Sequence, residues 1–354
     1  MSVFSTQTLL LFAAGCAGTA LAVPLGLPMP FMLGGIVGAG LAVLGIETRH
    51  GPRDLRLPTS FRMPFVALIG TMIGASFSPA LMAVLPGFWL SALAVIPFIM
   101  AAHFGGYMVM RHLGGYRRVD ALYAAMPGGL VEAVILGEKA GADPRVLAVQ
   151  HFVRVILVVI AVPFLFWLST GEVVGSAAGM TLSRGSYDIW DIAQIGAIAL
   201  AGMTLGRVSR LPAGFLMGPL FLCALLQVAG VTAVIAPPWL LAVSQLVIGV
   251  GLGAQFSGLR RAVLVRGVIT GIGAVGVMLA ISFGFAIGLH QLVPADTATL
   301  FLSFSPGGVT EMNLIALSLN LSPVIVAVHH LIRIVMTVVL TGQLQRVLAR
   351  RAAH

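Results

Sequence analysis

Apolar runs of about 20 residues, the length that a helix needs to cross a bilayer, follow one another along almost the whole chain. Apolar residues make up 59% of the chain and charged residues only 9%, whereas about a quarter of the residues in soluble domains are charged. We therefore expect an all-α polytopic membrane protein, and the lipid bilayer is its first expected partner.

The net charge of +9 does not indicate a nucleic-acid partner. The arginines lie in short loops between apolar runs, where positive charge marks the cytoplasmic side of a membrane protein. Cys16 and Cys223 both lie inside apolar runs, and they predict neither a disulfide framework nor a metal site. The first residues lack the positive region of a signal peptide, so we expect them to form the first membrane helix.

A long motif occurs twice. PGGLVEAVILGEKAGADPRVLAVQHFVR spans 127–154 and PGGVTEMNLIALSLNLSPVIVAVHHLIR spans 306–333, with Pro-Gly-Gly, Glu, Pro and His-x-x-Arg at one constant offset. LPMPFMLGG at 27–35 also resembles LPAGFLMGP at 211–219, and IGTMIGASFS at 69–78 resembles IGVGLGAQFS at 248–257. This self-similarity predicts two membrane repeats. We place them at 1–170 and 188–354, joined by a linker at 171–187.

Each repeat contains six apolar segments. They are 6–24, 29–46, 63–79, 86–110, 119–140 and 145–169 in the first repeat, and 189–206, 212–231, 237–257, 267–289, 295–318 and 322–345 in the second. In the first repeat, arginines follow the second and fourth segments. In the second repeat, they follow the first and third segments and occur again at the C-terminal end. By the positive-inside rule, this opposite phase predicts inverted topology with both termini in the cytoplasm.

Inverted repeats need an odd number of crossings, so one segment of the six should enter and leave on the same side. The Pro-Gly-Gly segments are the best candidates, because proline breaks a helix and glycine lets the chain reverse. Making the third segment re-entrant instead would put Arg111, Arg117 and Arg118 outside. We therefore predict about ten spanning helices and two re-entrant hairpins, with a broken helix that crosses fully as the rival geometry.

The polar residues of these segments predict a site near the middle of the membrane. Glu132 and Glu311 each begin a second half-helix, whose free N–H groups attract anions. His151 and Arg154, like His330 and Arg333, are three residues apart and share a helix face. The second tip is the more polar one. The candidate substrate- and ion-binding residues are Pro127, Gly128, Gly129, Glu132, His151, Arg154, Ser305, Pro306, Gly307, Gly308, Thr310, Glu311, Asn313, His330 and Arg333.

Buried charges in a membrane are costly and usually paired. We therefore expect Glu132 to pair with Arg154 or His151, and Glu311 with Arg333 or His330. The alternative is structural: such pairs can simply hold two helices together, and Pro-Gly-Gly can simply be a kink. No metal-binding His spacing, paired Cys or Ser nucleophile motif appears, so we expect neither an enzyme nor a cofactor beyond Na⁺ or H⁺ as a coupling ion.

The duplicated P-G-G-x-x-E…H-x-x-R pattern resembles the AbrB family of bacterial inner-membrane proteins, whose members carry the labels of regulators or of ammonia monooxygenases. The resemblance covers nearly the whole chain and implies a multi-pass protein of the bacterial inner membrane. The family is similar in architecture to secondary transporters with inverted repeats and re-entrant hairpins. That likeness implies a scaffold domain, a moving transport domain, an elevator motion and a homodimer.

We therefore expect a secondary transporter, a symporter that moves a small anionic or zwitterionic solute together with Na⁺ or H⁺. Arg154 or Arg333 would balance the charge of the solute, and Glu311 and Glu132 would bind Na⁺ or exchange a proton. Two alternatives remain: an ion channel that uses the same tips as its filter, and a membrane sensor or regulatory protein that binds a ligand without moving it.

Overall fold

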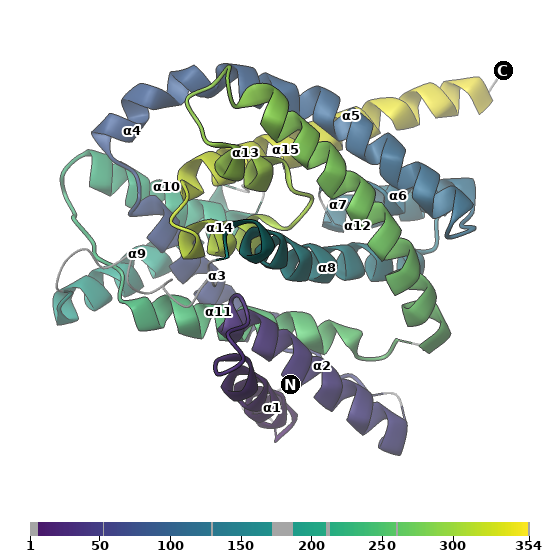
Figure 1. Cartoon of the computed structure of the whole chain (residues 1–354), viewed down its shortest axis with the longest axis horizontal. Helices are drawn as coiled ribbons and strands as arrows, with labels where there is room; N and C mark the ends of the chain where they lie inside the picture. The colour runs from purple at the N-terminus through teal and green to yellow at the C-terminus, as the bar shows by residue number, and fades with distance from the viewer. Residues whose placement is uncertain are drawn as a thin grey trace. The chain divides into compact units, whose positions relative to one another are not determined.

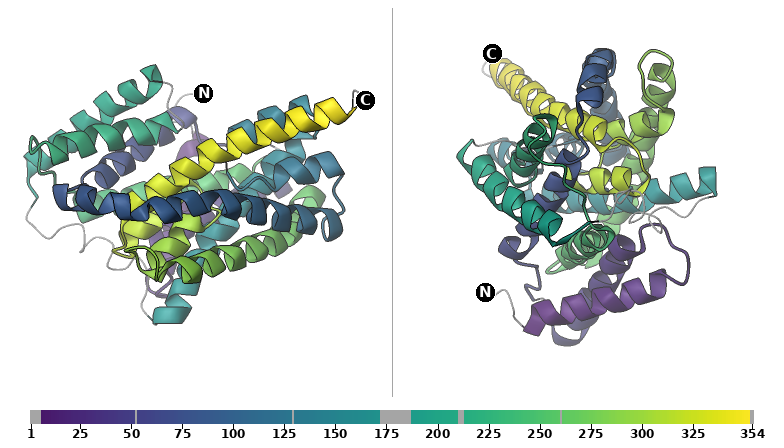
Figure 2. Two further views of the ribbon diagram at one scale, coloured as in Figure 1. Left: turned by 90° about the horizontal axis from the view of Figure 1, so that it is seen from above. Right: turned by 90° about the vertical axis from the view of Figure 1, so that its left-hand side faces the viewer.

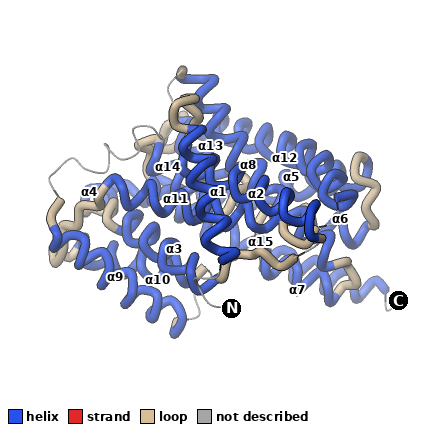
Figure 3. Tube along the Cα trace, turned by 90° about the horizontal axis from the view of Figure 1, so that it is seen from below, coloured by secondary structure: helices blue, strands red, loops and turns tan. Residues whose placement is uncertain are grey.

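The computed structural model describes residues 6–51, 53–128, 130–171, 187–209, 213–259 and 261–352. Every regular element in these ranges is helical (Figure 3). Six of the described helices are long and apolar enough to cross a membrane: Pro30–His50, Leu85–His112, Pro144–Ser169, Ile189–Val208, Pro238–Phe256 and Ala262–Leu289. The chain is therefore an all-helical protein of multi-pass membrane character, as its apolar runs predict.

The longer helices follow the predicted apolar segments closely (Figure 1). They are α1 Thr6–Ala22, α2 Pro30–His50, α3 Thr59–Gly74, α5 Trp89–His112, α8 Pro144–Thr170, α9 Ile189–Val208, α10 Gly214–Val228, α11 Pro238–Gly253, α12 Arg261–Leu289 and α15 Pro323–Ala352. A short helix, α4 (Pro79–Val84), precedes a 3₁₀ turn at Leu85–Phe88, and a second 3₁₀ turn at Ala254–Phe256 follows α11.

The two Pro-Gly-Gly segments are broken helices. The first consists of α6 (Arg118–Ala124) and α7 (Leu130–Lys139), and the second of α13 (Thr297–Phe304) and α14 (Val309–Ser318). Each break contains a proline, which cannot donate the backbone hydrogen bond that would continue the helix. The breaks therefore lie where the sequence predicts them.

The chain forms two compact units. Unit 1 contains Met1–Ala83, Val159–Leu259 and Thr310–Val324, and unit 2 contains Val84–Val158, Arg260–Val309 and Ile325–His354. Each unit takes helices from both predicted repeats, so the compact units do not coincide with residues 1–170 and 188–354. The division into repeats stays a prediction from the sequence.

The helices of unit 1 pack in a reciprocal way. Helix α2 packs against α11, and α3 packs against α10. A Cβ atom added at Gly249 of α11 would lie 2.4 Å from the Met32 carbonyl oxygen of α2, and one added at Gly70 of α3 would lie 2.3 Å from the Leu216 carbonyl oxygen of α10. Small residues let helix backbones approach this closely. Both contacts join residues from the stretches that match between the two repeats.

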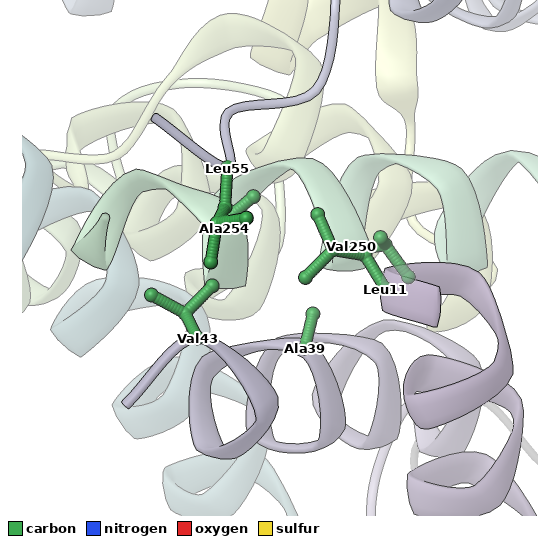
Figure 4. Close-up of a cluster of buried hydrophobic side chains, with 6 residues drawn as sticks. All are labelled: Leu11, Ala39, Val43, Leu55, Val250 and Ala254. Atoms are coloured by element: carbon green, nitrogen blue, oxygen red, sulfur yellow. The ribbon is translucent and has the colours of Figure 1, made fainter. Parts of the chain in front are cut away.

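A cluster of buried side chains between α1, α2 and α11 adds to the core of unit 1, and Figure 4 shows how these side chains point toward one another. Its buried members are Leu11, Ala39, Val43, Leu55, Val250 and Ala254.

The entries to α2 and α10 share an unusual backbone conformation. Met29 precedes α2 with φ 47° and Ala213 precedes α10 with φ 50°, both in the left-handed region. Side chains other than glycine rarely adopt this conformation. The two residues occupy the same place in LPMPFMLGG and LPAGFLMGP, so the sequence match extends to local geometry.

In unit 2, α5 lies along α12, as the two ribbons show in Figures 1 and 2. Three phenylalanines join these helices to the end of α13. The ring of Phe304 lies 5.2 Å from that of Phe98 on α5 and 5.5 Å from that of Phe285 on α12, centroid to centroid. Such aromatic pairs stabilise a core beyond the area they bury, and they fix the first half of the second broken helix in unit 2.

Candidate functional site

The first broken helix doubles back on itself. The Asp120 carboxylate, at the start of α6, accepts a hydrogen bond from the backbone N–H of Asp143 at 2.8 Å, just before α8. Arg117 donates to both Asp120 oxygens at 2.7 and 2.8 Å, and to the Gly141 carbonyl oxygen at 3.2 Å. The chain therefore leaves this segment beside the point where it entered, which is the geometry of a hairpin rather than of a broken helix that crosses fully.

In the sequence, Asp120 lies between Leu85–His112 and Pro144–Ser169, two of the helices that are long enough to cross a membrane. Burial alone would raise the pKa of its carboxyl group, but the hydrogen bond from Arg117, the N–H of Asp143 and the charge of Arg117 together hold that pKa below its usual range. The carboxylate form is therefore the one that closes the hairpin.

Apolar side chains fill the inside of this hairpin. The buried members of the cluster, which come from α6, the break, α7, the turn after α7 and the start of α8, are Tyr123, Met126, Ala133, Ala142 and Leu147. The cluster holds the two half-helices together, so the position of the break relative to α8 is fixed by packing as well as by hydrogen bonds.

The predicted His-Arg pair of α8 contacts the end of α6. Arg154 donates from Nη1 to the Met126 carbonyl oxygen, immediately before Pro127. The Nε2 atom of His151 lies 3.1 Å from the Tyr123 carbonyl oxygen. The last carbonyl groups of a helix have no partner within the helix, and at membrane depth each unsatisfied group costs several kcal/mol. Arg154 supplies such a donor for Met126, and His151 adds a contact to the Tyr123 carbonyl oxygen, to which the Met126 N–H also donates at 3.4 Å.

The same contact occurs at the second break. Arg333 of α15 donates from Nη1 to the Ser305 carbonyl oxygen, immediately before Pro306, and from Nη2 to the Gly307 carbonyl oxygen at 2.6 Å. Met126 and Ser305 hold the same place in the two copies of the motif. In each copy of the motif the arginine therefore donates to carbonyl groups at its own helix break, and positive charge there is favourable because a helix C-terminus carries partial negative charge.

The equivalent histidines differ in their partners. His151 contacts the hairpin, whereas Nδ1 of His330 lies 2.9 Å from the Val326 carbonyl oxygen of its own helix. The His330 ring also interacts with the backbone of Ser305 at the second break. His329 is a packing residue, with its ring nitrogens 2.8 Å from the Ile325 carbonyl oxygen and 2.9 Å from the Ser91 hydroxyl oxygen.

The tip of the first hairpin lies against α15. A Cβ atom added at Gly128 would lie 3.5 Å from Oγ1 of Thr337 and 3.8 Å from Nε of Arg333. The same arginine therefore contacts carbonyl groups of the second break and faces the first. The positive charges of Arg154 and Arg333 act on each other. Unit 2 thus brings together Pro127, Gly128, His151, Arg154, Ser305, Pro306, Gly307, His330 and Arg333 from the two copies of the motif.

Other predicted site residues belong to unit 1. Glu311 lies half-buried in the first turn of α14, near Thr310 and the buried Asn313. Within this unit the positive charge that acts on Glu311 is that of Arg62. Since Arg333 belongs to unit 2, its pairing with Glu311 stays a prediction. Gly308 lies at the break, on the unit 2 side of the division.

Gly129 and the side chain of Glu132 lie outside the described part of the chain, so the pairing of Glu132 with Arg154 or His151 is likewise a prediction. The ion pair seen among the described residues joins Arg117 to Asp120. Where the sequence predicts carboxylates as partners of Arg154 and Arg333, the partners found within unit 2 are backbone carbonyl oxygens.

Sequence reasoning missed Thr337, whose hydroxyl group is fully buried at the first tip. The signal was available, because Thr337 follows Arg333 by four residues and shares its helix face. Within the described ranges, no group of three or more His, Cys, Asp or Glu side chains gathers closely enough to hold a metal ion.

Comparison with known proteins gives a consistent assignment. Residues 36–349 match the family model described as "Transition state regulatory protein AbrB". The chain is similar to "Uncharacterized protein YhjN" of Bacillus subtilis (strain 168), at 26% identity over 79% of this chain and 77% of that one. It is equally similar to "Putative regulator AbrB" of Escherichia coli (strain K12), at 26% identity over 86% of each.

Proposed function

This chain belongs to the AbrB family, and we propose that it is a secondary transporter of the bacterial inner membrane. It carries a small anionic or zwitterionic solute together with Na⁺ or H⁺, by an elevator-like motion. In this proposal its ten long helices span the membrane as two inverted repeats, both termini are cytoplasmic, and the protein works as a homodimer.

One observation carries the proposal: two helices break at Pro-Gly-Gly in matching places of the two motifs, and an arginine of the same repeat is bonded to each break. Irregular backbone at membrane depth is tolerated only where protein or a water-filled cavity covers it. Broken helices at corresponding places of two repeats are the sequence feature that best points to a transporter's substrate site.

The chain segments that make up the two units support an elevator mechanism. Each unit draws on both repeats, and together they divide the chain into two compact bodies. An elevator needs such a division, because one body stays in the membrane as a scaffold while the other moves with the solute. Unit 2, which holds the first hairpin and both arginines, is the body that we assign to transport.

The carboxylates have the complementary role. Glu311 starts α14 beside Thr310 and Asn313, which supply the oxygen atoms that Na⁺ prefers. We propose that Glu311, and Glu132 in the first copy, bind Na⁺ or exchange a proton as the solute enters. Binding of a cation would then be coupled to binding of an anion without a fixed ion pair between the two sites.

A second candidate function comes from the name of the Escherichia coli relative, "Putative regulator AbrB". A regulator would bind a ligand and pass the signal to another protein without moving the ligand. A channel is the third candidate, and it would conduct far faster than a carrier turns over. Binding measurements cannot separate these functions, but solute uptake can.

The first experiment is a thermal-stability screen of the purified protein against carboxylates, amino acids and inorganic anions, each with Na⁺ or K⁺ and at two pH values. A ligand that binds only the folded protein raises its melting temperature. We expect a solute-specific, ion-dependent increase that Glu311→Gln abolishes. If the melting temperature still increases in Glu311→Gln, the ion site lies elsewhere. If no solute increases the melting temperature of the wild type, coupled binding is contradicted.

A further inference from the structure

We propose that Arg154 and Arg333, one from each repeat, bind a single oxyanion beside the tip of the first hairpin, with the Thr337 hydroxyl group as a third ligand. The inference rests on the proposed transporter, because it narrows the solute to a molecule that carries a carboxylate, phosphate or sulfate group. Zwitterions then qualify only through their acidic group.

The two guanidinium groups are buried cations that lack an opposite charge in the described part of unit 2. Arg154 is 7% exposed and Arg333 is 2% exposed, and each repels the other. Carbonyl oxygens carry no net charge, so the bonds to the helix breaks leave both positive charges uncompensated. Burying like charges together is costly unless an opposite charge accompanies them, and a bound anion supplies it.

The carboxylates described in unit 2 do not supply that charge. Asp120 pairs with Arg117, Asp143 accepts from the N–H of Arg145, Asp296 accepts from the N–H of Thr299, and Glu138 is exposed. The side chain of Glu132 lies outside the described residues, so the experiment below tests it directly.

Unpartnered donors mark the place of the anion. The Nε atoms of Arg154 and Arg333 and the hydroxyl group of Thr337 are buried without a hydrogen-bond partner. The Nε of Arg333 and the Oγ1 of Thr337 face the same small space at Gly128, because a Cβ added there would meet both at 3.8 and 3.5 Å. Arg154 reaches the same turn of chain through its bond to Met126.

These groups suit an oxyanion. An arginine N–H and a hydroxyl group both donate hydrogen bonds, and bonds from a guanidinium to an oxyanion are about twice as strong as bonds between neutral groups. Each arginine keeps Nη atoms on a carbonyl oxygen at the helix breaks, so its position is set before the anion arrives. The absence of a side chain at Gly128 leaves a space of about the size of one methyl group beside these donors.

The test compares Thr337→Val with the wild type. Valine has nearly the same shape as threonine, and the hydroxyl group has no partner within the protein, so the variant should fold with an unchanged melting temperature. Its affinity for the anion should fall about tenfold, the usual effect of removing a hydrogen bond to a charged group. Calorimetric titration with sodium sulfate, inorganic phosphate and succinate measures this affinity.

Two further variants sharpen the result. Gly128→Ala adds a methyl group that fits at van der Waals distance but occupies the proposed anion space, so it should also weaken binding at least about tenfold. The matched control is Thr270→Val, because the Thr270 hydroxyl group is buried in the same unit but already donates to the Arg266 carbonyl oxygen at 2.8 Å. The control should bind the anions as tightly as the wild type.

Each outcome decides the question. Equal affinity in Thr337→Val, Gly128→Ala and wild type places the anion elsewhere and overturns the inference. Anion binding that appears only in Glu132→Gln also overturns it, since Glu132 would then be the counter-charge. A third outcome is that phosphatidylglycerol nanodiscs stabilise the protein, free anions do not, and Thr337→Val abolishes the effect. The site would then bind a lipid headgroup, and the inference that it binds the transported solute would be overturned.

Failure of the inference and failure of the proposed function look different. Uptake of a cationic or neutral solute by a protein that binds none of the anions overturns the anion site and leaves the transporter intact. Thr337-dependent anion binding without uptake of any solute supports the site and contradicts the transporter.

Discussion

The Asp120 carboxylate and the Asp143 backbone N–H, separated by 23 residues of sequence, form a 2.8 Å hydrogen bond that closes the first hairpin. The bond joins the residue where the chain enters this segment to the residue where it leaves. The two ends of the segment therefore lie together, as in a hairpin, and the re-entrant topology that the arginine pattern favours stays a prediction.

Removing this carboxylate should loosen the hairpin. In Asp120→Ala, Arg117 loses its ion-pair partner and the N–H of Asp143 loses its acceptor. We expect the free energy of unfolding to fall by about 1–3 kcal/mol, the usual cost of a buried group left unsatisfied. The exposed Arg117 side chain adds little, because ion pairs at the surface are weak. Apparent melting temperature in detergent measures the effect, and an unchanged value would contradict this role of Asp120.

The same contact predicts a pH dependence. The pKa of Asp120 is lowered in the folded protein, so its contribution to stability is complete above the unfolded value and is lost as the pH falls through the folded value. The difference in melting temperature between wild type and Asp120→Ala should therefore be constant from pH 8 to about 5 and shrink below about 4. A difference that grows on acidification would show that the sign is wrong.

The close helix contacts of unit 1 should not tolerate a larger side chain. In Gly249→Ala the new methyl group would lie 2.4 Å from the Met32 carbonyl oxygen, well inside van der Waals contact. We expect a loss of about 1–3 kcal/mol in the free energy of unfolding, as for other overpacked sites.

Gly276→Ala is the matched control for this substitution. Gly276 lies within α12, and a Cβ atom there would meet nothing within 4 Å. Alanine is the better helix former by roughly 1 kcal/mol, so the control should keep or slightly raise the melting temperature. Equal behaviour of the two variants would contradict the packing described for α2 and α11.

The two arginines should differ in how much stability they contribute. Arg333 donates to the carbonyl oxygens of both Ser305 and Gly307, whereas the described contact of Arg154 is with Met126 alone. Lysine keeps the charge but loses the rigid fork of donors. We expect Arg333→Lys to destabilise the protein by about 1–3 kcal/mol and Arg154→Lys by less, measured by thermal unfolding. The reverse order would contradict the contacts at the second break.

The hairpin can also be tested in the membrane. Arg118→Cys and Ala140→Cys, each in a Cys16→Ser, Cys223→Ser background, place a single thiol at an exposed position on either arm of the first hairpin. An impermeant maleimide should label both from the same side in oriented vesicles. Labelling from opposite sides would show that the segment crosses.

Much of this fold can be predicted from the sequence, because a bilayer demands helices of a fixed length and Pro-Gly-Gly breaks them. The breaks between α6 and α7 and between α13 and α14 lie where the motif predicts. These features are local, so sequence pattern determines them.

The partners of the arginines could not be predicted in the same way. Charge pairing suggests Glu132 and Glu311, and these pairings stay predictions. It does not suggest the carbonyl groups at the ends of α6 and α13 to which Arg154 and Arg333 donate. Every residue has a carbonyl group, so the sequence does not show which of them a break leaves without a partner. The division into two units, each built from both predicted repeats, depends on long-range packing and likewise cannot be predicted from local sequence patterns.

The most direct test of transport by this protein is uptake into proteoliposomes of the anion that binds best in calorimetry, with and without a Na⁺ or H⁺ gradient. We expect saturable, gradient-driven accumulation at carrier rates, with the apparent affinity reduced about tenfold in Thr337→Val and unchanged in Thr270→Val. Tight binding of the anion without any accumulation would contradict transport and leave a ligand-binding regulator as the function of this protein.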